Sequence, residues 1–277
     1  MKKFATGALL LPCVLWLVFL VLIPLFLICY YGFTVKDAGG IARFSFENFS
    51  NFLEPFYINV LLRSLYLSLI ATVLCLVIGY PVAMILAGGT FKHSSVLLLM
   101  IIAPMWMNFL LRTYAWLTLL ERSGVINSLL KAFGFGEVVF LGNEKAVVFG
   151  MVYNLLPYMI LPIYNSISKI PSNILEAARD LGANDLRCFG KIILPLSLPG
   201  VLSGITMVFV PGVTTFVISQ FLGSGNVSMI GDIIEQQFLK ANNWGFGAAI
   251  SIIVMIVVIL CMWLVNKFSD EPEVTIP

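Results

Sequence analysis

Charged residues are scarce in this chain of 277 residues. They make up 11% of the sequence, against about 25% in an ordinary soluble domain. Hydrophobic residues make up 60%, and the mean hydropathy is +1.01. Such an apolar surface needs lipid around it, which excludes a soluble globular fold. The net charge of +2 and the lack of a basic patch argue against a nucleic acid partner.

Cysteine and histidine are also scarce, and neither forms a recognisable pattern. The single histidine, His93, stands in a predicted turn without a companion for a metal site or a catalytic triad. The five cysteines share no pairing or metal-binding spacing, so we interpret them as small core residues. They are Cys13, Cys29, Cys75, Cys188 and Cys261. We therefore expect no disulfide, no metal, no catalytic residue and no cofactor in this chain.

An energy source is missing too. The sequence has no G-x-x-x-x-G-K-[ST] motif to hold the phosphates of ATP. It also has no Asp, Glu or Lys in the middle of a predicted span, where ion-coupled transporters commonly carry ionisable groups. These absences weigh against a secondary transporter and an intramembrane protease. We predict a protein that is not an enzyme and that is either passive or driven by another subunit.

Long uncharged runs predict an all-α integral membrane protein with six transmembrane helices. The run 192–222 is too long for one span, and we expect breaks at Pro195, Pro199 and Pro211. Gly79-Tyr80-Pro81 is expected to interrupt and kink the second span. The first run lacks a cleavage site, so we interpret it as a retained span. The spans cover roughly 8–33, 64–88, 95–119, 146–168, 192–222 and 244–266.

Six spans place both termini on the same side of the membrane. If that side is the cytoplasm, eight of the sixteen basic residues lie in short inner segments. Lys2 and Lys3 flank the first span, whose charges usually weigh most in topology. The inner set is Lys2, Lys3, Lys92, Lys169, Arg179, Arg187, Lys191 and Lys267. We therefore predict cytoplasmic termini and a cytoplasmic segment between spans four and five.

That cytoplasmic segment is a polar hairpin of about residues 172–195. Its helix begins at Pro171-Ser172-Asn173, and with Asn173 as the cap Glu176 would complete a capping box. Gly182 suits the left-handed turn after a helix, and a second short helix is expected near Asn184 or Asp185. The small Ala177 and Ala178 would let another surface approach closely. From the residues alone, a docking element and a solvated loop without a partner remain open.

The hairpin carries a signature that decides between them. Its spacing E-A-A-x3-G-x9-I-x-L-P resembles that of permease subunits of bacterial ABC importers, in which the hairpin docks on a cytoplasmic ATPase. The matching residues are Glu176, Ala177, Ala178, Gly182, Ile192, Leu194 and Pro195. The resemblance implies the type I ABC importer permease fold and ATP hydrolysis in a separate subunit. It implies that the first four residues form the docking surface and its turn, and that the last three seat the hairpin against the membrane core.

Other segments resemble more narrowly the PotB-type permeases of spermidine/putrescine importers. They include Gly79-Tyr80-Pro81-Val82-Ala83, Leu111-Arg112-Thr113-Tyr114 and Trp244-Gly245-Phe246-Gly247-Ala248-Ala249. The resemblance implies polyamine uptake across a bacterial cell membrane. It also implies a second, related permease, two ATPase subunits and an external polyamine-binding protein. The chain would divide into a first helix with its outer loop (1–63), a permease domain (64–266) and a cytoplasmic tail (267–277).

A path for a polycation should offer amides, hydroxyls and aromatic faces. The residues of this kind in the spans are Trp106, Asn108, Tyr153, Asn154, Tyr158, Thr214, Thr215 and Gln220. Each of them equally suits helix packing or the interfacial belt. In some relatives an acidic residue occupies the place of Gln220, and the amide removes a possible cation contact.

Three charged residues near the predicted outer side need separate interpretation. Arg112 is expected to snorkel to the outer headgroups or to pair with Glu121 or another loop acid, rather than touch a polycation. Asp232 and Glu235 in the last outer loop are candidates for contact with the binding protein or the emerging cargo. Their alternative role is that of ordinary solvated charges.

Two alternatives to polyamine import stay open. The first keeps the importer and changes the cargo to another small solute delivered by a binding protein. The second is a passive channel or a membrane scaffold that has no ATPase. Copurification of an ATPase through the hairpin distinguishes the second alternative from both importers.

Overall fold

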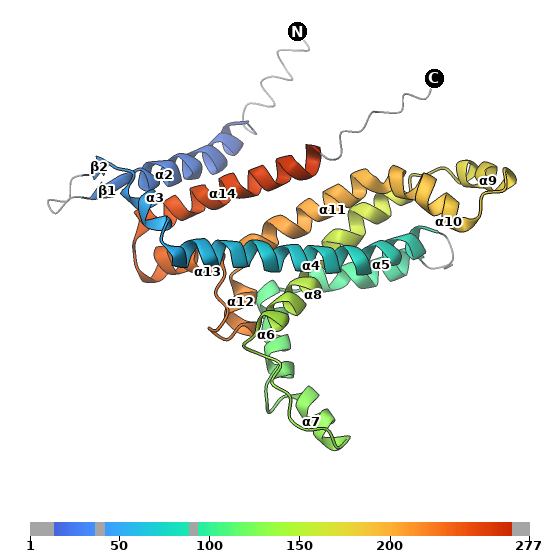
Figure 1. The fold of residues 1–277 in the computed structure, drawn as a ribbon, viewed down its shortest axis with the longest axis horizontal. Helices are drawn as coiled ribbons and strands as arrows, with labels where there is room; N and C mark the ends of the chain where they lie inside the picture. The colour runs from blue at the N-terminus through green and yellow to red at the C-terminus, as the bar shows by residue number, and fades with distance from the viewer. Residues whose placement is uncertain (1–13, 37–41, 89–93, 268–277) are drawn as a thin grey trace, which may run out of the picture. The chain divides into compact units, whose positions relative to one another are not determined.

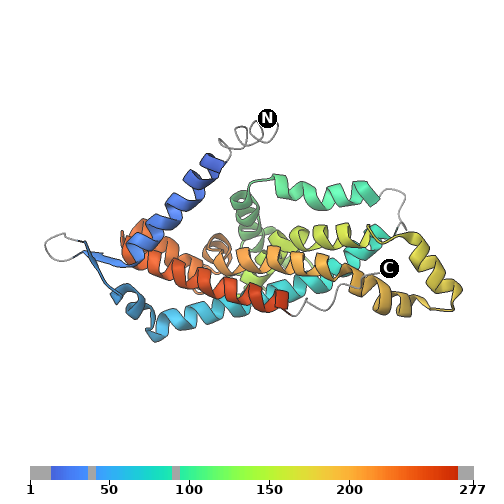
Figure 2. The same cartoon turned by 90° about the horizontal axis from the view of Figure 1, so that it is seen from above.

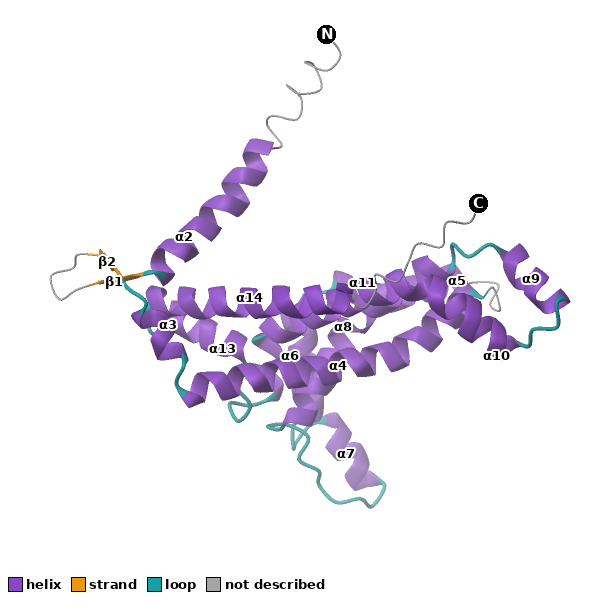
Figure 3. Ribbon diagram, turned by 45° about the horizontal axis from the view of Figure 1, so that its top comes forward, coloured by secondary structure: helices purple, strands orange, loops and turns teal. Residues whose placement is uncertain are grey.

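The computed structural model describes residues 14–36, 42–88 and 94–267. Lys2, Lys3, Cys13, Lys92, His93 and all but the first residue of the tail 267–277 lie outside the described residues. The described part is mainly helical, with one two-stranded ribbon as its departure from the all-α expectation (Figures 1 and 3).

The elements follow one another along the chain as a series of long helices with short ones between them. In order they are η1 (Val18–Leu22, a π-helical turn), α2 (Ile23–Gly32), β1 (Thr34–Lys36), β2 (Ala42–Phe44), α3 (Glu47–Phe52), α4 (Pro55–Ala87), α5 (Ser94–Ile102), η2 (Ala103–Trp106, a 3₁₀ turn), α6 (Phe109–Leu120), α7 (Val125–Ala132), α8 (Glu144–Ile167), α9 (Ser172–Asp180), α10 (Asp185–Cys188), η3 (Phe189–Ile193, π-helical), α11 (Leu194–Thr214), α12 (Val217–Leu222), α13 (Ile230–Glu235), η4 (Gln236–Lys240, π-helical) and α14 (Trp244–Lys267).

Five helical stretches of the described chain are long and apolar enough to cross a membrane. They are Val14–Gly32, Pro55–Ala87, Glu144–Ile167, Asp185–Thr214 and Trp244–Val265. Ser94–Trp106 and Phe109–Ala132 are long and apolar enough only together, with a bend of 92° between them, as in a broken span or a re-entrant loop (Figure 2). With this pair counted as one broken span, all six predicted spans are present.

The breaks do not lie where the prolines predict them. Gly79-Tyr80-Pro81 does not interrupt α4. This helix of 33 residues continues past Pro81 to Ala87. Pro199 and Pro211 also lie inside α11, and the fifth span breaks instead at Thr215, whose ψ is 138°. Membrane helices tolerate proline because neighbouring groups satisfy the freed carbonyl. Proline content alone therefore predicts these breaks poorly.

The chain divides into two compact units, and the first combines Met1–Asn59 with Ile233–Val258. In this unit β1 and β2 pair antiparallel, with Val35 opposite Arg43. Phe33 stacks on Phe44 at 5.6 Å between ring centroids and meets Phe49 at 4.7 Å. Aromatic clustering of this kind is typical of segments beside a membrane interface.

The second unit combines Val60–Asp232 with Ile259–Pro277 and holds most of the buried core. Its central pair is α8 and α11, which run alongside each other (Figures 1 and 2). Met159 and Ile163 of α8 are fully buried. Gly200 of α11 lies so close to α8 that an added Cβ would be 2.6 Å from the carbonyl oxygen of Pro162. Close approach at small residues is how membrane helices gain packing energy.

Candidate coupling and transport sites

The hairpin between spans four and five is closed by backbone hydrogen bonds at Gly182. The amide of Gly182 donates to the carbonyl of Arg179 at 2.8 Å, and that of Ala183 donates to Ala178 at 3.0 Å. These two bonds form a Schellman motif, which satisfies the last carbonyls of α9. Gly182 has φ +81°, the left-handed conformation that glycine adopts without strain. The predicted turn is therefore confirmed in its local geometry.

A second short helix follows the turn, as predicted. The side chain of Asn184 caps α10 by accepting a hydrogen bond from the amide of Arg187 at 2.9 Å. The guanidinium of Arg179 donates to the carboxylate of Asp185 at 3.1 Å, which links α9 to α10 across the turn. Both charged groups are largely exposed, so this pair fixes geometry more than it adds stability.

The predicted capping box is absent. Pro171, not Asn173, occupies the cap position of α9, and no side chain accepts a hydrogen bond from its first turn. Pro171 holds the extended backbone that precedes a helix, so α9 begins two residues earlier than a capping box with Asn173 as its cap requires. Glu176 is consequently exposed on the outside of α9 with no side-chain hydrogen bond to the described part of the chain.

Apolar side chains on this hairpin face outward. Leu181 is 89% exposed and Leu186 is 82% exposed, while Ala177 is exposed and Ala178 is half-buried. The hairpin projects beyond the ends of α8 and α11 (Figures 1 and 3). Two fully exposed leucines on a polar element outside the spans mark a surface suited to a partner.

The base of the hairpin is held by contacts that the sequence did not predict. Ile192 is half-buried, but Leu194 and Pro195 are exposed in this chain. Phe189 instead meets Tyr80 of α4 edge to face at 5.7 Å. The hydroxyl of Tyr80 shares a buried hydrogen bond of 2.8 Å with the hydroxyl of Ser197 in α11. A buried tyrosine needs such a partner, but spacing does not identify one 117 residues away.

Four of the eight predicted path residues line one cavity of about 650 Å³ in the second unit. They are Asn154, Tyr158, Thr214 and Thr215. Asn154 is 1% exposed, and its amide donates to the carbonyl of Gly150 at 2.9 Å. Its side-chain oxygen, Oδ1, has no hydrogen-bond partner among the described residues. A buried acceptor left open beside a cavity is suited to a donor on a ligand.

The other four path candidates lie outside this cavity. Asn108 uses its side-chain oxygen to cap α6, by accepting from the amides of Leu110 and Leu111. Tyr153 packs edge to face on Trp116 at 5.2 Å. Trp106 is 80% exposed, and Gln220 is exposed on α12. None of these four lines the space that the cavity residues share.

The predicted position of Arg112 at the outer headgroups is wrong. Arg112 is only 7% exposed and lines the same cavity, so it does not snorkel to the headgroups. Glu121 is no partner either, because nine residues of helix separate the two along α6 by about 14 Å. The Nε atom of Arg112 has no hydrogen-bond partner among the described residues. Its guanidinium lies 5.9 Å from the ring centroid of Phe109.

The cavity lies where two helices break. Met107, in extended conformation between η2 and α6, borders it on one side. Thr215, between α11 and α12, borders it on the other. Irregular backbone at membrane depth is tolerated where it lines a cavity, because the unpaired peptide groups need polar contacts there. Discontinuous helices of this kind commonly form the sites of membrane transporters.

The two outer-loop candidates have structural partners in this chain. The carboxylate of Asp232 accepts a hydrogen bond from the amide of Met229 at 2.7 Å and so orders the start of α13. Glu235 pairs with Lys240 at 3.4 Å. Their predicted contact with a binding protein or cargo stays a prediction.

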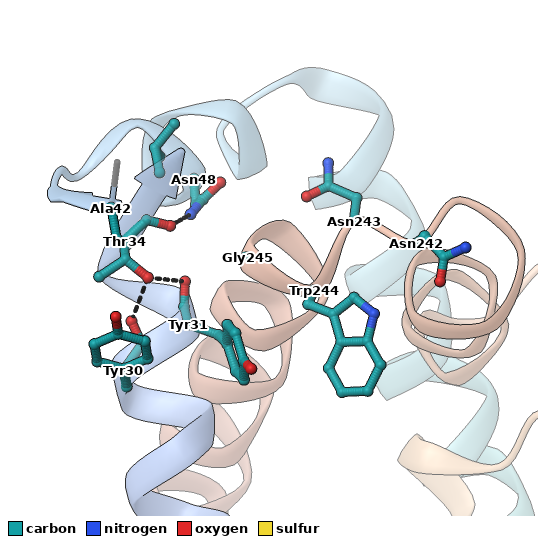
Figure 4. A pocket seen from close by; sticks show the side chains of 10 residues that line it. Tyr30, Tyr31, Thr34, Ala42, Asn48, Asn242, Asn243, Trp244 and Gly245 are labelled. Atoms are coloured by element: carbon teal, nitrogen blue, oxygen red, sulfur yellow. Dashed lines mark hydrogen bonds between the residues drawn. The ribbon is translucent and has the colours of Figure 1, made fainter. Parts of the chain in front are cut away.

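A second cavity, of about 480 Å³, lies in the first unit beside the β-ribbon (Figure 4). Tyr31 and Trp244 meet there with ring centroids 5.8 Å apart. The amide of Asn48 donates to the carbonyls of Gly32 and Thr34, each at 3.2 Å. Since the buried side-chain amide of Asn48 already holds the backbone in place, we assign this cavity a structural role.

Comparison with known proteins places these features in one context. A family model described as the binding-protein-dependent transport system inner membrane component matches residues 79–271. The chain belongs to this family. This inner membrane component is therefore a multi-pass transport subunit and not an enzyme.

Relatives of this inner membrane component match it over nearly their whole length. It is 39% identical over 263 residues to the spermidine/putrescine transport system permease protein PotB of Haemophilus influenzae, covering 92% of each chain. It is 38% identical over 263 residues to the protein of the same name in Escherichia coli, covering 92% of this chain and 96% of the other.

A solved structure shows that the fold is shared too. The bacterial alginate ABC transporter, in complex with alginate pentasaccharide-bound periplasmic protein, contains a chain with a TM-score of 0.77 at 18% identity. The match covers 97% of this chain and 95% of that one. The expected type I ABC importer permease fold is thereby confirmed.

Proposed function

We propose that the chain is the permease subunit of an ATP-driven importer that carries spermidine or putrescine into the cytoplasm. The observation that carries this proposal is the identity of 38–39% with spermidine/putrescine permeases over at least 92% of both chains. The candidate path is the cavity lined by Asn154, Tyr158, Thr214 and Thr215.

The chemistry of that cavity suits an ammonium group. An ammonium only donates hydrogen bonds, and the open Oδ1 of Asn154 only accepts them. The carboxyl end of α11 at Thr214 adds the partial negative charge of a helix C-terminus. Tyr158 offers an aromatic face, worth about 0.5–2 kcal/mol to a cation. Neutral acceptors of this kind bind a polycation weakly enough for it to pass.

The other subunits of the proposed importer are inferred from the family. The hairpin with Glu176, Ala177, Ala178 and Gly182 docks on one of two ATPase subunits in the cytoplasm, where both termini lie. A second, related permease completes the membrane pair, and an external polyamine-binding protein delivers cargo near Asp232 and Glu235. The chain itself holds no cofactor, since ATP is bound and hydrolysed by the ATPases.

The test is ATP hydrolysis by the complete importer reconstituted in lipid with its own binding protein. We expect spermidine or putrescine, presented with the binding protein, to stimulate hydrolysis and to accumulate in vesicles. The control omits the binding protein. If neither polyamine stimulates hydrolysis while the complex is intact, the cargo assignment fails.

A second cargo class has one observation in its favour. The buried guanidinium of Arg112 in the cavity suits an anionic solute. The same assay therefore includes small dicarboxylates and sulfate. Stimulation by one of these and not by a polyamine would assign the importer to an anion.

Within the proposed path, Asn154 is the residue whose removal is most informative. Asn154→Leu keeps the volume but removes the acceptor, and a hydrogen bond to a charged group contributes about 1.5–3 kcal/mol. We expect polyamine uptake to fall about 10-fold to about 100-fold. The matched control is Tyr153→Phe, one residue away on α8 and outside the cavity. Equal uptake by Asn154→Leu and wild type would remove the cavity from the path.

A further inference from the structure

Arg112 is a buried charge without a counterion among the residues that the structure describes. Arg112 is 7% exposed, and its Nε atom has no hydrogen-bond partner among the described residues. No carboxylate of the described residues forms an ion pair with it. The guanidinium remains charged under all ordinary conditions. A charge removed from water needs an opposite charge or several hydrogen bonds to offset its desolvation.

The acidic residues that follow Arg112 up to the start of α8 are engaged elsewhere or too distant. Glu137 pairs with Lys131 at 3.1 Å, and Glu144 pairs with Arg63 at 3.5 Å. Glu121 lies at the far end of α6. Lipid phosphate is an unsuitable partner, because Arg112 is only 7% exposed and lines the cavity. None of the described residues therefore supplies an anion to Arg112.

We infer that Arg112 forms an ion pair with a carboxylate of the second permease subunit, at the level of the cargo cavity. This inference rests on the proposed function, which supplies both the second permease and a cationic cargo. A polyamine cannot neutralise a guanidinium, so the opposing charge has to be a protein carboxylate. Arg112 is then a specificity-determining residue that lies beside the cargo without binding it.

The pair has a consequence for transport. An ammonium group of the cargo competes with Arg112 for the same carboxylate, and Arg112 recovers it when the cargo leaves. Without Arg112 the carboxylate would retain the cation. The variant Arg112→Gln should therefore show a lower apparent KM for polyamine together with a lower maximal rate, a combination that mere loss of packing would not produce.

A charge-swap experiment on the complete importer tests the inference. Arg112→Glu is combined with variants in which each acidic residue of the second permease is changed in turn to Arg. We expect Arg112→Glu to lower the Tm of the purified complex and to reduce uptake at least about tenfold. We expect that changing one acidic residue of the second permease to Arg restores most of the Tm and most of the uptake that Arg112→Glu loses. The control is Arg122→Gln, which removes a basic residue that is largely exposed just beyond α6.

The outcomes separate this inference from the proposed cargo. The Tm readout needs no cargo, so rescue of Tm upholds the ion pair even if wild-type importer moves no polyamine. The inference is overturned if Arg112→Gln matches wild type in Tm, KM and maximal rate. It is also overturned if the complex assembles and no acidic position restores Arg112→Glu. Stimulation by an anionic solute that Arg112→Gln abolishes would make Arg112 a cargo contact instead.

Discussion

At the scale of single residues, Gly182 shows how one backbone angle fixes a functional surface. Its φ of +81° lets the amides of Gly182 and Ala183 close the end of α9, and open space surrounds the position where a side chain would begin. A substitution there meets no steric clash with neighbouring atoms. For Gly182→Ala the effect comes from backbone strain, of about 1 kcal/mol, whereas Gly182→Pro also removes the amide that donates to Arg179.

Gly182 gives a sharp prediction about coupling. We expect Gly182→Ala, and more strongly Gly182→Pro, to loosen the hairpin and to lower the ratio of polyamine transported to ATP hydrolysed, while the protein still inserts. Glu176→Lys should act in the same direction through the exposed face of α9. Gly190→Ala is the matched control, because Gly190 also has open space around it but an ordinary φ.

This prediction is checked by measuring uptake and hydrolysis in the same vesicles, with membrane insertion followed by protease protection. Normal coupling ratios and normal ATPase binding in Gly182→Pro and Glu176→Lys would remove the coupling role from the hairpin.

Residues whose roles are local could be predicted from the sequence, and residues that act over long separations could not. Gly182 and Asn184 were identified because a helix end and a helix cap involve near neighbours in the chain. Arg112 was misjudged because its environment is built by α8 and α11, far away in sequence. Ser64 accepts a hydrogen bond from the amide of Ile230, 166 residues away, and no spacing rule predicts such a contact.

Among the helices, the α8–α11 pair leaves no room for a Cβ atom at Gly200. At Gly200 an added methyl group would meet the backbone of Pro162 and the side chain of Ser166, both at 2.6 Å. Backbone cannot move aside cheaply, so the two helices would have to separate. The pair α8–α11 also joins the hairpin to the cavity, which makes its packing relevant to function.

We expect Gly200→Ala to destabilise the chain by about 1–3 kcal/mol and to lower the Tm of the purified protein. The matched control is Ser203→Thr, which adds one methyl group to the same helix at an exposed position. A Gly200→Ala protein with the Tm of wild type would mean that the α8–α11 contact relaxes without cost.

The existence of the spans could be predicted, but their breaks could not. A run of about 20 apolar residues is sufficient to identify a membrane helix. Where such a helix breaks depends on whether neighbours satisfy the peptide groups around a proline. Pro81 and Pro199 are accommodated within α4 and α11, whereas Met107 and Thr215 leave the helical conformation beside the cavity.

Taken over the complete chain, the exposed hairpin carries an apolar tip that would face the ATPase in the proposed importer. Leu181 and Leu186 place two large apolar side chains in water at its tip. Each buried side chain of this kind contributes about 1.5–3 kcal/mol relative to exposure. Their burial would stabilise a complex with the ATPase substantially.

We expect Leu181→Asp and Leu186→Asp to reduce copurification of the ATPase with the permease about tenfold or more, without changing expression in the membrane. Phe133→Asp serves as the control, because Phe133 is 78% exposed but lies just after α7, between spans three and four. Retention of the ATPase by both leucine variants would mean that this surface is not the interface.

One continuous path of helix has a mechanical consequence. The segment from Asp185 to Thr214 passes through η3 into α11 without leaving helical conformation, and its 30 residues extend about 45 Å. It begins in the hairpin and ends at the wall of the cavity. If the hairpin docks on the ATPase as proposed, a displacement of the hairpin reaches Thr214 through this one helical segment, without passing through a loop.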